Sequence, residues 1–211
     1  MLLRRKVLLY IIIFTATVLF IAVSSGCNCA KVDTSLSVNE TLEKLHEQYK
    51  DSPELFEAAV YAYNFNVTIE EAQNRFKIED AFRGLETELE TNEFETYAGL
   101  WIQHEPAFRI VVAFTRDGEE TIKKYVSANL TAYVEARTVK YSYSELLDAQ
   151  SKVMIALRDL GIPADSASYV QENCVEFRVT DLTEIDKAIE DGRLIIPECV
   201  RIVVGSLAVP E

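Results

Sequence analysis

Few side chains in this sequence could do covalent or metal chemistry. The chain has two histidines, His46 and His104, and four cysteines, Cys27, Cys29, Cys174 and Cys199. A hydrolytic triad needs three matched partners, and a zinc site needs four ligands or three plus water. We interpret His104, which lies at an expected turn, as a surface histidine and His46 as part of a solvated helix face. The sequence therefore predicts a protein that is not an enzyme.

Other candidate groups have simple structural interpretations. The acidic run at residues 86–95 lacks the residue order of a calcium loop, so we expect a solvated helix face. Cys174 has no base beside it in the sequence. Trp101, the only tryptophan, is expected in the core. Tyr141 and Tyr143 are expected to pack at an interface. No glycine-rich phosphate loop is present, and we predict no metal and no cofactor.

The two downstream cysteines allow two interpretations. In an exported protein, Cys174 and Cys199 could form a structural disulfide, because such bonds persist outside the cytoplasm. They could equally be two buried free thiols, since an unpaired cysteine behaves as a small apolar residue. Spacing alone does not decide between the two.

The N-terminus has the pattern of an export segment. Basic residues at positions 4–6 precede an uncharged stretch at 7–23, followed by small residues. Ser24-Ser25-Gly26-Cys27 resembles a lipobox, which predicts lipidation of Cys27, although Ser24 stands where Leu, Val or Ile is usual. The alternatives are secretion after cleavage at Ser24, at the A-x-S site Ala22-Val23-Ser24, and an uncleaved membrane anchor. All three predict an extracytoplasmic location, and two predict attachment to the membrane.

The net charge limits the class of partner. The chain has 34 acidic and 21 basic residues, a formal charge of −13, and the part after residue 30 carries −16. Such a surface argues against binding nucleic-acid phosphates, which requires a basic face. It favours a neutral or basic protein partner instead. A content of 49% apolar residues excludes a disordered chain, while the oligomeric state stays open.

Hydrophobic periodicity predicts helices and strands in a repeating order. Capping boxes at Thr68 and Ser142 each predict the start of a long helix. The predicted helices are 38–49, one from Pro53, 68–91, a short one through Ile122, one from Ser142 to about Gly161, and 181–190. The predicted strands are 97–103, 108–114, 134–141, 166–170, 174–179 and 199–204.

The two halves of this order match each other. A shift of 63 residues places Val112 on Val175, Phe114 on Phe177 and Ile122 on Ile185. The sequence thus predicts an α+β fold with two tandem α-β-β-α-β copies, at 67–142 and 143–205, each a small sheet with helices on one face. The predicted domains are an export segment (1–26), a tether with a short helix (27–52), and two subdomains (53–142 and 143–211).

Three short motifs resemble the pro-regions of secreted chymotrypsin-like bacterial serine proteases, the α-lytic protease and streptogrisin group. Ala98–Trp101 is similar to their A-G-x-W strand, and Val111–Thr115 to the V-V-x-V-T strand that follows. Val139–Leu146 looks like their V-x-Y-S-x-x-E-L junction between subdomains. The resemblance covers about residues 55–205, and the order of the motifs is more distinctive than any single one.

The resemblance implies a two-subdomain module that helps a protease fold and then blocks its cleft with its last strand and C-terminal tail. Physically this is strand addition, in which main-chain hydrogen bonds give affinity and side-chain pockets give specificity. The implied partner is a secreted chymotrypsin-like serine protease. The implied partner-binding residues are Val200, Ile202, Val204, Leu207, Val209, Pro210 and Glu211.

The chain departs from that family in one respect. In the family a catalytic domain follows the pro-region, whereas this sequence ends at Glu211 without a Gly-Asp-Ser-Gly motif. The resemblance then implies action on a separate protease, or a scaffold that no longer acts on one. The alternative is an envelope lipoprotein with a structural or general protein-binding role and no protease partner.

Overall fold

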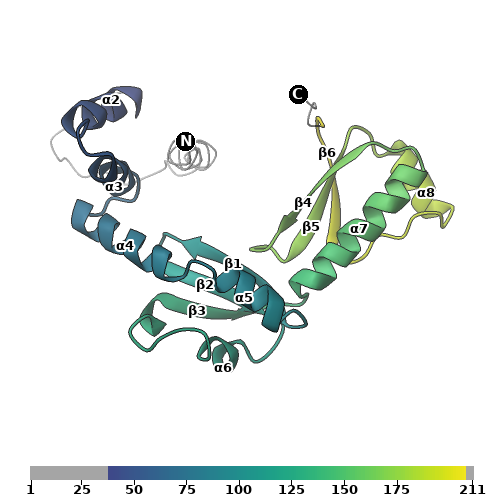
Figure 1. Cartoon of the computed structure of the whole chain (residues 1–211). Helices are drawn as coiled ribbons and strands as arrows, with labels where there is room; N and C mark the ends of the chain where they lie inside the picture. The colour runs from purple at the N-terminus through teal and green to yellow at the C-terminus, as the bar shows by residue number, and fades with distance from the viewer. Residues whose placement is uncertain (1–37, 208–211) are drawn as a thin grey trace, which may run out of the picture. The chain divides into compact units, whose positions relative to one another are not determined.

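The computed structural model describes residues 38–207 of the chain. The predicted export segment, the cleavage site at Ser24 and the lipidation site at Cys27 lie outside these residues, as do Val209, Pro210 and Glu211. The chain forms two compact units, residues 1–76 and 77–211, and the boundary falls inside helix α4 (Ile69–Ala81) (Figure 1). The predicted division at residue 142 stays a prediction.

The described part of the first unit is helical. It contains α2 (Val38–Gln48), α3 (Pro53–Asn64) and the first half of α4. Pro53 occupies the first turn of α3, where its missing N–H has no intrahelical partner to lose. The backbone N–H of Glu71 donates to Thr68 Oγ1, as the first predicted capping box requires. Small residues of α3 pack with α4 in a core of Ala58, Tyr61, Ala62 and Ala72.

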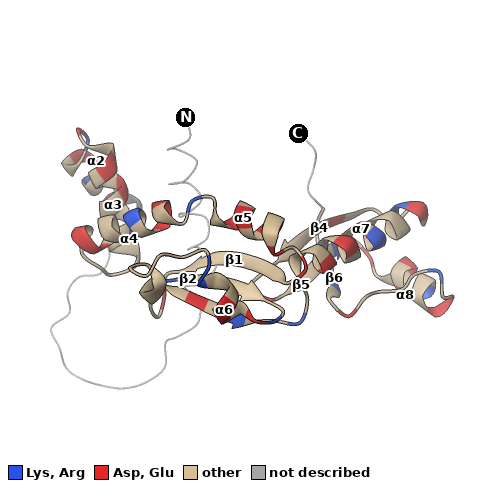
Figure 2. Cartoon of the chain, turned by 60° about the horizontal axis from the view of Figure 1, so that its bottom comes forward, with Lys and Arg blue, Asp and Glu red and all other residues tan. Residues whose placement is uncertain are grey.

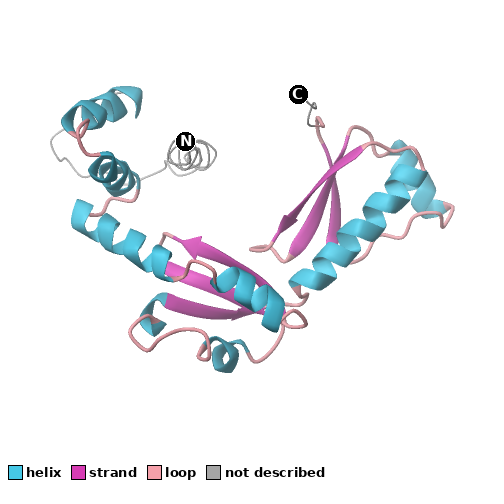
Figure 3. Cartoon of the chain, in the orientation of Figure 1, coloured by secondary structure: helices cyan, strands magenta, loops and turns pink. Residues whose placement is uncertain are grey.

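The second unit contains two three-stranded sheets with helices (Figure 3). Beyond the end of α4, the elements around the first sheet are α5 (Leu85–Asn92), β1 (Tyr97–Gln103), β2 (Arg109–Phe114), α6 (Gly118–Ile122), a 3₁₀ helix (Thr131–Tyr133) and β3 (Val134–Thr138). Those around the second sheet are α7 (Tyr143–Asp159), β4 (Ala164–Tyr169), β5 (Cys174–Val179), α8 (Thr183–Glu190) and β6 (Val200–Val204). The predicted mixed α and β character is confirmed.

The two sheets have the same strand pairing. In the first sheet, β1 pairs antiparallel with β2, and β2 pairs parallel with β3. In the second, β4 pairs antiparallel with β5, and β5 pairs parallel with β6. A short helix, α6 or α8, connects each parallel pair, because parallel strands cannot be joined by a tight turn.

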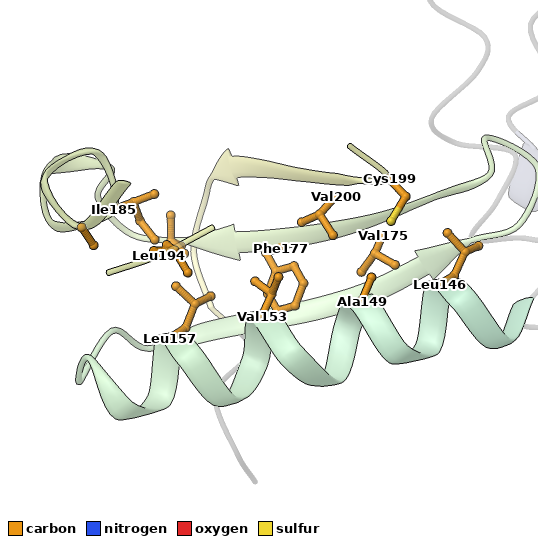
Figure 4. Packing of buried hydrophobic residues seen from close by; sticks show 12 residues of the cluster. Leu146, Ala149, Val153, Leu157, Val175, Phe177, Ile185, Leu194, Cys199 and Val200 are labelled. Carbon is orange, nitrogen blue, oxygen red and sulfur yellow. The ribbon is translucent and has the colours of Figure 1, made fainter. Parts of the chain in front are cut away.

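Each sheet buries one face in its own apolar core. Helix α7 places its predicted stripe of Leu146, Ala149, Val153 and Leu157 against the second sheet, where Val175 and Phe177 meet it (Figure 4). Ile185 of α8 belongs to the same core. The corresponding core of the first sheet contains Leu89 from α5, Ile122 from α6 and the strand residues Ile110, Val112 and Phe114. An amphipathic helix over a small sheet is the arrangement that the periodicity predicted.

The predicted single helix at 68–91 is wrong. The structure has two helices, α4 ending at Ala81 and α5 beginning at Leu85. Gly84 between them has a φ of +91°, in the left-handed region that glycine adopts without steric cost. The break lets Phe82, Leu85 and Leu89 all reach the core of the first sheet.

Asn173 joins the turn between β4 and β5 to the segment that precedes α7. Its Oδ1 accepts hydrogen bonds from the backbone N–H groups of Lys140 (3.1 Å) and Tyr141 (2.8 Å), and its Nδ2 donates to Tyr141 O (2.7 Å). Its own φ is +51°, a conformation that asparagine tolerates better than most residues. These bonds explain why β3 ends at Thr138 and does not continue to Tyr141 as predicted.

We expect substitution of Asn173 to reveal both of its roles. Asn173→Gly removes three hydrogen bonds but permits the positive φ, and should cost about 2 kcal/mol of unfolding free energy. Asn173→Ala adds the strain of a Cβ in the left-handed region and should cost about 1 kcal/mol more. Urea denaturation of both variants measures the difference. Equal midpoints for the wild type and both variants would contradict this role.

Candidate functional site

The predicted partner-binding strand forms an open edge of the second sheet. Val175 N donates to Cys199 O and Gly205 N donates to Val179 O, so the odd-numbered residues of this segment bond to β5. Backbone groups alternate in direction along a strand. Ile202 and Val204 therefore direct their N–H and C=O groups to the side that carries no strand among the described residues, whereas the N–H of Val200 donates to Pro197 O.

This edge has little protection against strand addition. Natural proteins commonly guard an edge with lysine, proline or a bulge. Strand β6, Val-Arg-Ile-Val-Val, has none of these, and its one charged residue, Arg201, is paired with Glu172 and Glu176. Val204 is 60% exposed and Leu207 is half-buried, while Val200 packs in the core. The strand thus offers backbone hydrogen-bonding groups on one side while its buried residues anchor it on the other.

Trp101 does not lie in the core as predicted. A β-bulge between Tyr97 and Gly99 shifts the alternation, so that Leu100 and Ile102 face the core and Trp101 faces away from it. Gly99 has a φ of +140°, and a Cβ there would lie 2.6 Å from Val170 Cβ, so no other residue fits the bulge. The sequence pattern carried no sign of this change of register.

Trp101 instead pairs with an arginine across the outer face of the first sheet. The guanidinium of Arg137 on β3 lies 5.2 Å from the ring centroid, at cation–π distance. Its Nη2 is also 2.6 Å from Glu135 Oε1. Val111 and Ala113 of the middle strand are fully buried. This outer face belongs to none of the apolar cores among the described residues. The Trp101–Arg137 pair therefore helps to shield it from water.

The second sheet has a similar pair on its outer face. The guanidinium of Arg201 on β6 lies 5.2 Å from the ring centroid of Tyr169 on β4. Its Nε donates to Glu176 Oε2 at 2.9 Å, and Nη1 pairs with Glu172. These contacts hold the first and last strands across the middle one.

The two candidate disulfide cysteines are free thiols in the structure. Cys174 is the first residue of β5 and Cys199 directly precedes β6, and the two face opposite sides of the second sheet. Cys199 belongs to the core (Figure 4), whereas Cys174 alternates with the core residue Val175 and lies near Arg201. Burial raises the pKa of both thiols, and it is the largest influence on each. A raised pKa lowers the thiolate fraction, which makes Cys174 a poor nucleophile.

The histidines and the junction tyrosines each lie beside aromatic or apolar neighbours. His46 is exposed on α2, with its ring edge-on to Phe56 at 5.4 Å. His104 lies in the loop after β1, and its ring centroid is 6.3 Å from that of Phe108. Tyr141 packs against the core of the second sheet and Tyr143 against that of the first. Among residues 38–207, no three metal-ligating side chains come together.

A cavity that the sequence analysis missed lies between α5, β1 and the first turn of α7. Its volume is about 230 Å³, and its walls are Glu90, Phe94, Tyr97, Tyr143, Ser144 and Leu147. The ring centroids of Tyr97 and Tyr143 are 6.4 Å apart, and Ser144 Oγ donates to Phe94 O. Phe94 and Leu147 are 58% and 44% exposed. The cavity thus combines aromatic and apolar walls with one carboxylate, that of Glu90.

A buried hydroxyl and two carboxylates of like charge lie close together at the cavity, which is an unfavourable arrangement. Tyr97 is 1% exposed, and its buried hydroxyl has no hydrogen-bond partner among the described residues. Burial, followed by the negative charges of Glu86 and Glu90, raises the pKa of this hydroxyl. Burial and the charge of Glu90 raise the pKa of Glu86. Acidic residues occur along α5 (Figure 2). A cation is the group that would relieve this arrangement.

One signal in the sequence could have located the cavity. Glu86 and Glu90 are four residues apart, so like charges share one helix face, which is destabilising unless something compensates. The acidic run was correctly expected on a helix, but its link to Tyr97 and Tyr143 depends on how α5 and α7 meet β1. That arrangement involves residues far apart in the sequence.

No protein-family model matches the sequence, and no curated protein matches it at a significant level. Within the described part of the chain, none of the helices has the length and apolar character needed to cross a bilayer.

We expect Tyr97→Phe to leave the protein as stable as the wild type or more stable, by about 1 kcal/mol. The substitution removes a buried hydroxyl that lacks a partner and keeps the ring. Tyr125→Phe is the matched control, because the Tyr125 hydroxyl donates to Glu93 Oε1 at 2.9 Å and its loss should cost about 1 kcal/mol. Urea denaturation measures both. A large loss of stability in Tyr97→Phe would contradict the absence of a partner.

Glu86 should make stability fall as pH rises. Its pKa is raised in the folded protein, so the folded state binds more protons than the unfolded state between the ordinary and the raised value. Stability is therefore highest below this window and lower above it. The Glu86→Gln variant lacks this loss, so its stability relative to the wild type should increase as the pH rises above the ordinary carboxyl pKa of about 4. Glu88→Gln controls for net charge, and a constant difference between Glu86→Gln and the wild type would refute the effect.

Proposed function

We propose that the chain is a non-catalytic, membrane-tethered extracytoplasmic module that binds a secreted chymotrypsin-like serine protease. Binding occurs through strand β6 and the C-terminal tail. The observation that carries this proposal is the open edge of β6, where Ile202 and Val204 present their backbone groups. An extended segment of a partner can add to such an edge, with specificity from the exposed side chains.

The tandem α-β-β-α-β organisation is part of the same proposal. Central-strand residues Val112 and Phe114 correspond to Val175 and Phe177 at the predicted shift of 63 residues, and both pairs are buried. In the register, Phe114 is opposite Thr138 and Phe177 is opposite Ile202. The last strands therefore correspond at a shift of 64. Equivalent pairing at equivalent positions supports an internal duplication.

The outer faces support the duplication independently of the cores. Trp101 is opposite Val111, and Arg137 is opposite Ala113, two residues further along β2. In the second sheet, Tyr169 is opposite Cys174, and Arg201 is opposite Glu176, again two residues further along β5. An aromatic ring on the first strand and an arginine on the third thus occupy the same positions in both sheets.

The proposal predicts inhibition of proteases of the resembling family. The full chain should inhibit purified α-lytic protease or a streptogrisin, each without its own pro-region, at micromolar concentration or below. Removal of residues 205–211 should weaken inhibition. Hydrolysis of a chromogenic peptide substrate provides the measurement. Full activity of both proteases at saturating concentrations of the chain would reject this partner, leaving the alternative of a lipoprotein with another role.

A second variant tests strand addition directly. Val204→Pro removes one outward N–H from β6 without touching a hydrogen bond to β5, because proline is tolerated at such edge positions. Val204→Ala is the matched control that loses side-chain volume but keeps the N–H. We expect about tenfold weaker inhibition from the proline variant than from the alanine variant. Equal inhibition by the two variants would exclude backbone pairing at Val204.

A further inference from the structure

The cavity between α5, β1 and α7 has walls suited to a flat or elongated cation. The rings of Phe94, Tyr97 and Tyr143 line it, and aromatic faces attract cations. At about 230 Å³ it is smaller than the usual pocket for a whole organic ligand, which holds about 300 Å³ or more. A single side chain is the size of group that such a space accepts.

The charges at the cavity specify the sign of the group. Glu90 lines the cavity, and Glu86 lies one helical turn before it on α5. Neither carboxylate has an ion pair with any residue in 38–207. A cation in the cavity would be attracted to Glu90 and would offset the repulsion between Glu90 and Glu86.

The buried hydroxyl of Tyr97 is an independent sign of a missing partner. Buried polar groups in folded proteins are nearly always hydrogen-bonded, because an unpaired one costs about 1–3 kcal/mol. This oxygen lies near the same two carboxylates, whose charges act on its pKa. A donor that enters the cavity can supply the bond that the described residues do not.

We propose that this cavity binds an arginine side chain of a partner protein. A guanidinium is planar and carries five donors, so it can stack on an aromatic ring while it bonds to carboxylate oxygens. Its aliphatic stem can pack on exposed Phe94 and Leu147. Lysine shares the charge and the stem but lacks the plane, and should bind more weakly.

The structure favours a protein segment over a free amine. Phe94 and Leu147 extend apolar surface beyond the space that one side chain fills, and flanking residues of a chain can cover this surface. The overall charge of −13 attracts a basic protein. The site uses no residue of β6, so it can exist whether or not the edge of that strand binds a protease.

The test uses labelled peptides and the full chain. Fluorescence anisotropy compares a fluorescein-labelled Leu-Gly-Arg-Gly-Leu peptide with the same peptide carrying citrulline, the neutral isostere of arginine. We expect saturable binding of the arginine peptide and at least about tenfold weaker binding of the citrulline peptide. The double variant Glu86→Gln/Glu90→Gln should bind the arginine peptide at least about tenfold more weakly. The single variant Glu88→Gln, on the same helix, should stay within about twofold of the wild type.

Several results would overturn the proposal. These are a lack of saturable binding, equal binding of the citrulline peptide, and unchanged affinity in the double variant. Tyr97→Phe should weaken binding of the arginine peptide several-fold while the protein stays folded. An unchanged affinity would show that the Tyr97 hydroxyl does not bind the peptide. Competition by free arginine as strong as that by unlabelled peptide would point to a small-molecule site and reject a protein partner. The peptide-binding assay contains no protease, so a negative result in it is distinct from a failure of the proposed protease inhibition.

Discussion

The start of α7 is the constraint on which most of the second unit depends. The Ser142 side chain accepts from Glu145 N and the Glu145 carboxylate accepts from Ser142 N, which closes a capping box. Asn173 holds the preceding backbone at Lys140 and Tyr141. With the first turn fixed in this way, the stripe of α7 meets the second sheet in register. The same turn carries Tyr143 and Leu147 to the wall of the cavity.

The two sheets solve the same physical problem in the same way. A three-stranded sheet with helices on one face leaves the middle strand exposed on the other, and water there would compete with its packing. In each sheet, an aromatic ring on the first strand and an arginine on the third reach toward each other over the middle strand. Carboxylates beside the arginines, Glu135 and Glu176, hold the guanidinium groups in place. A layer of this kind substitutes for a second layer of helices.

Local signals in the sequence predicted much of this fold. Strands β1 and β5 have the predicted ends, and the capping box at Ser142 marks the start of α7, because these features depend on neighbouring residues. The break at Gly84 and the bulge before Gly99 were missed, since a glycine alone does not reveal its φ. The cavity was missed for a different reason: its walls come from three elements whose meeting is set by tertiary packing. Strand β6 was predicted from the sequence, but its register with β5 was needed to tell which of its backbone groups face outward.

The placement of the two downstream thiols has a consequence for how the protein can fold. Because Cys174 and Cys199 lie on opposite faces of one sheet, the second core closes around Val175, Phe177 and Leu157 without any covalent cross-link. The native arrangement requires no oxidation step, so it can form to completion in a reducing or an oxidising compartment alike. The core of the second sheet therefore does not depend on a disulfide catalyst.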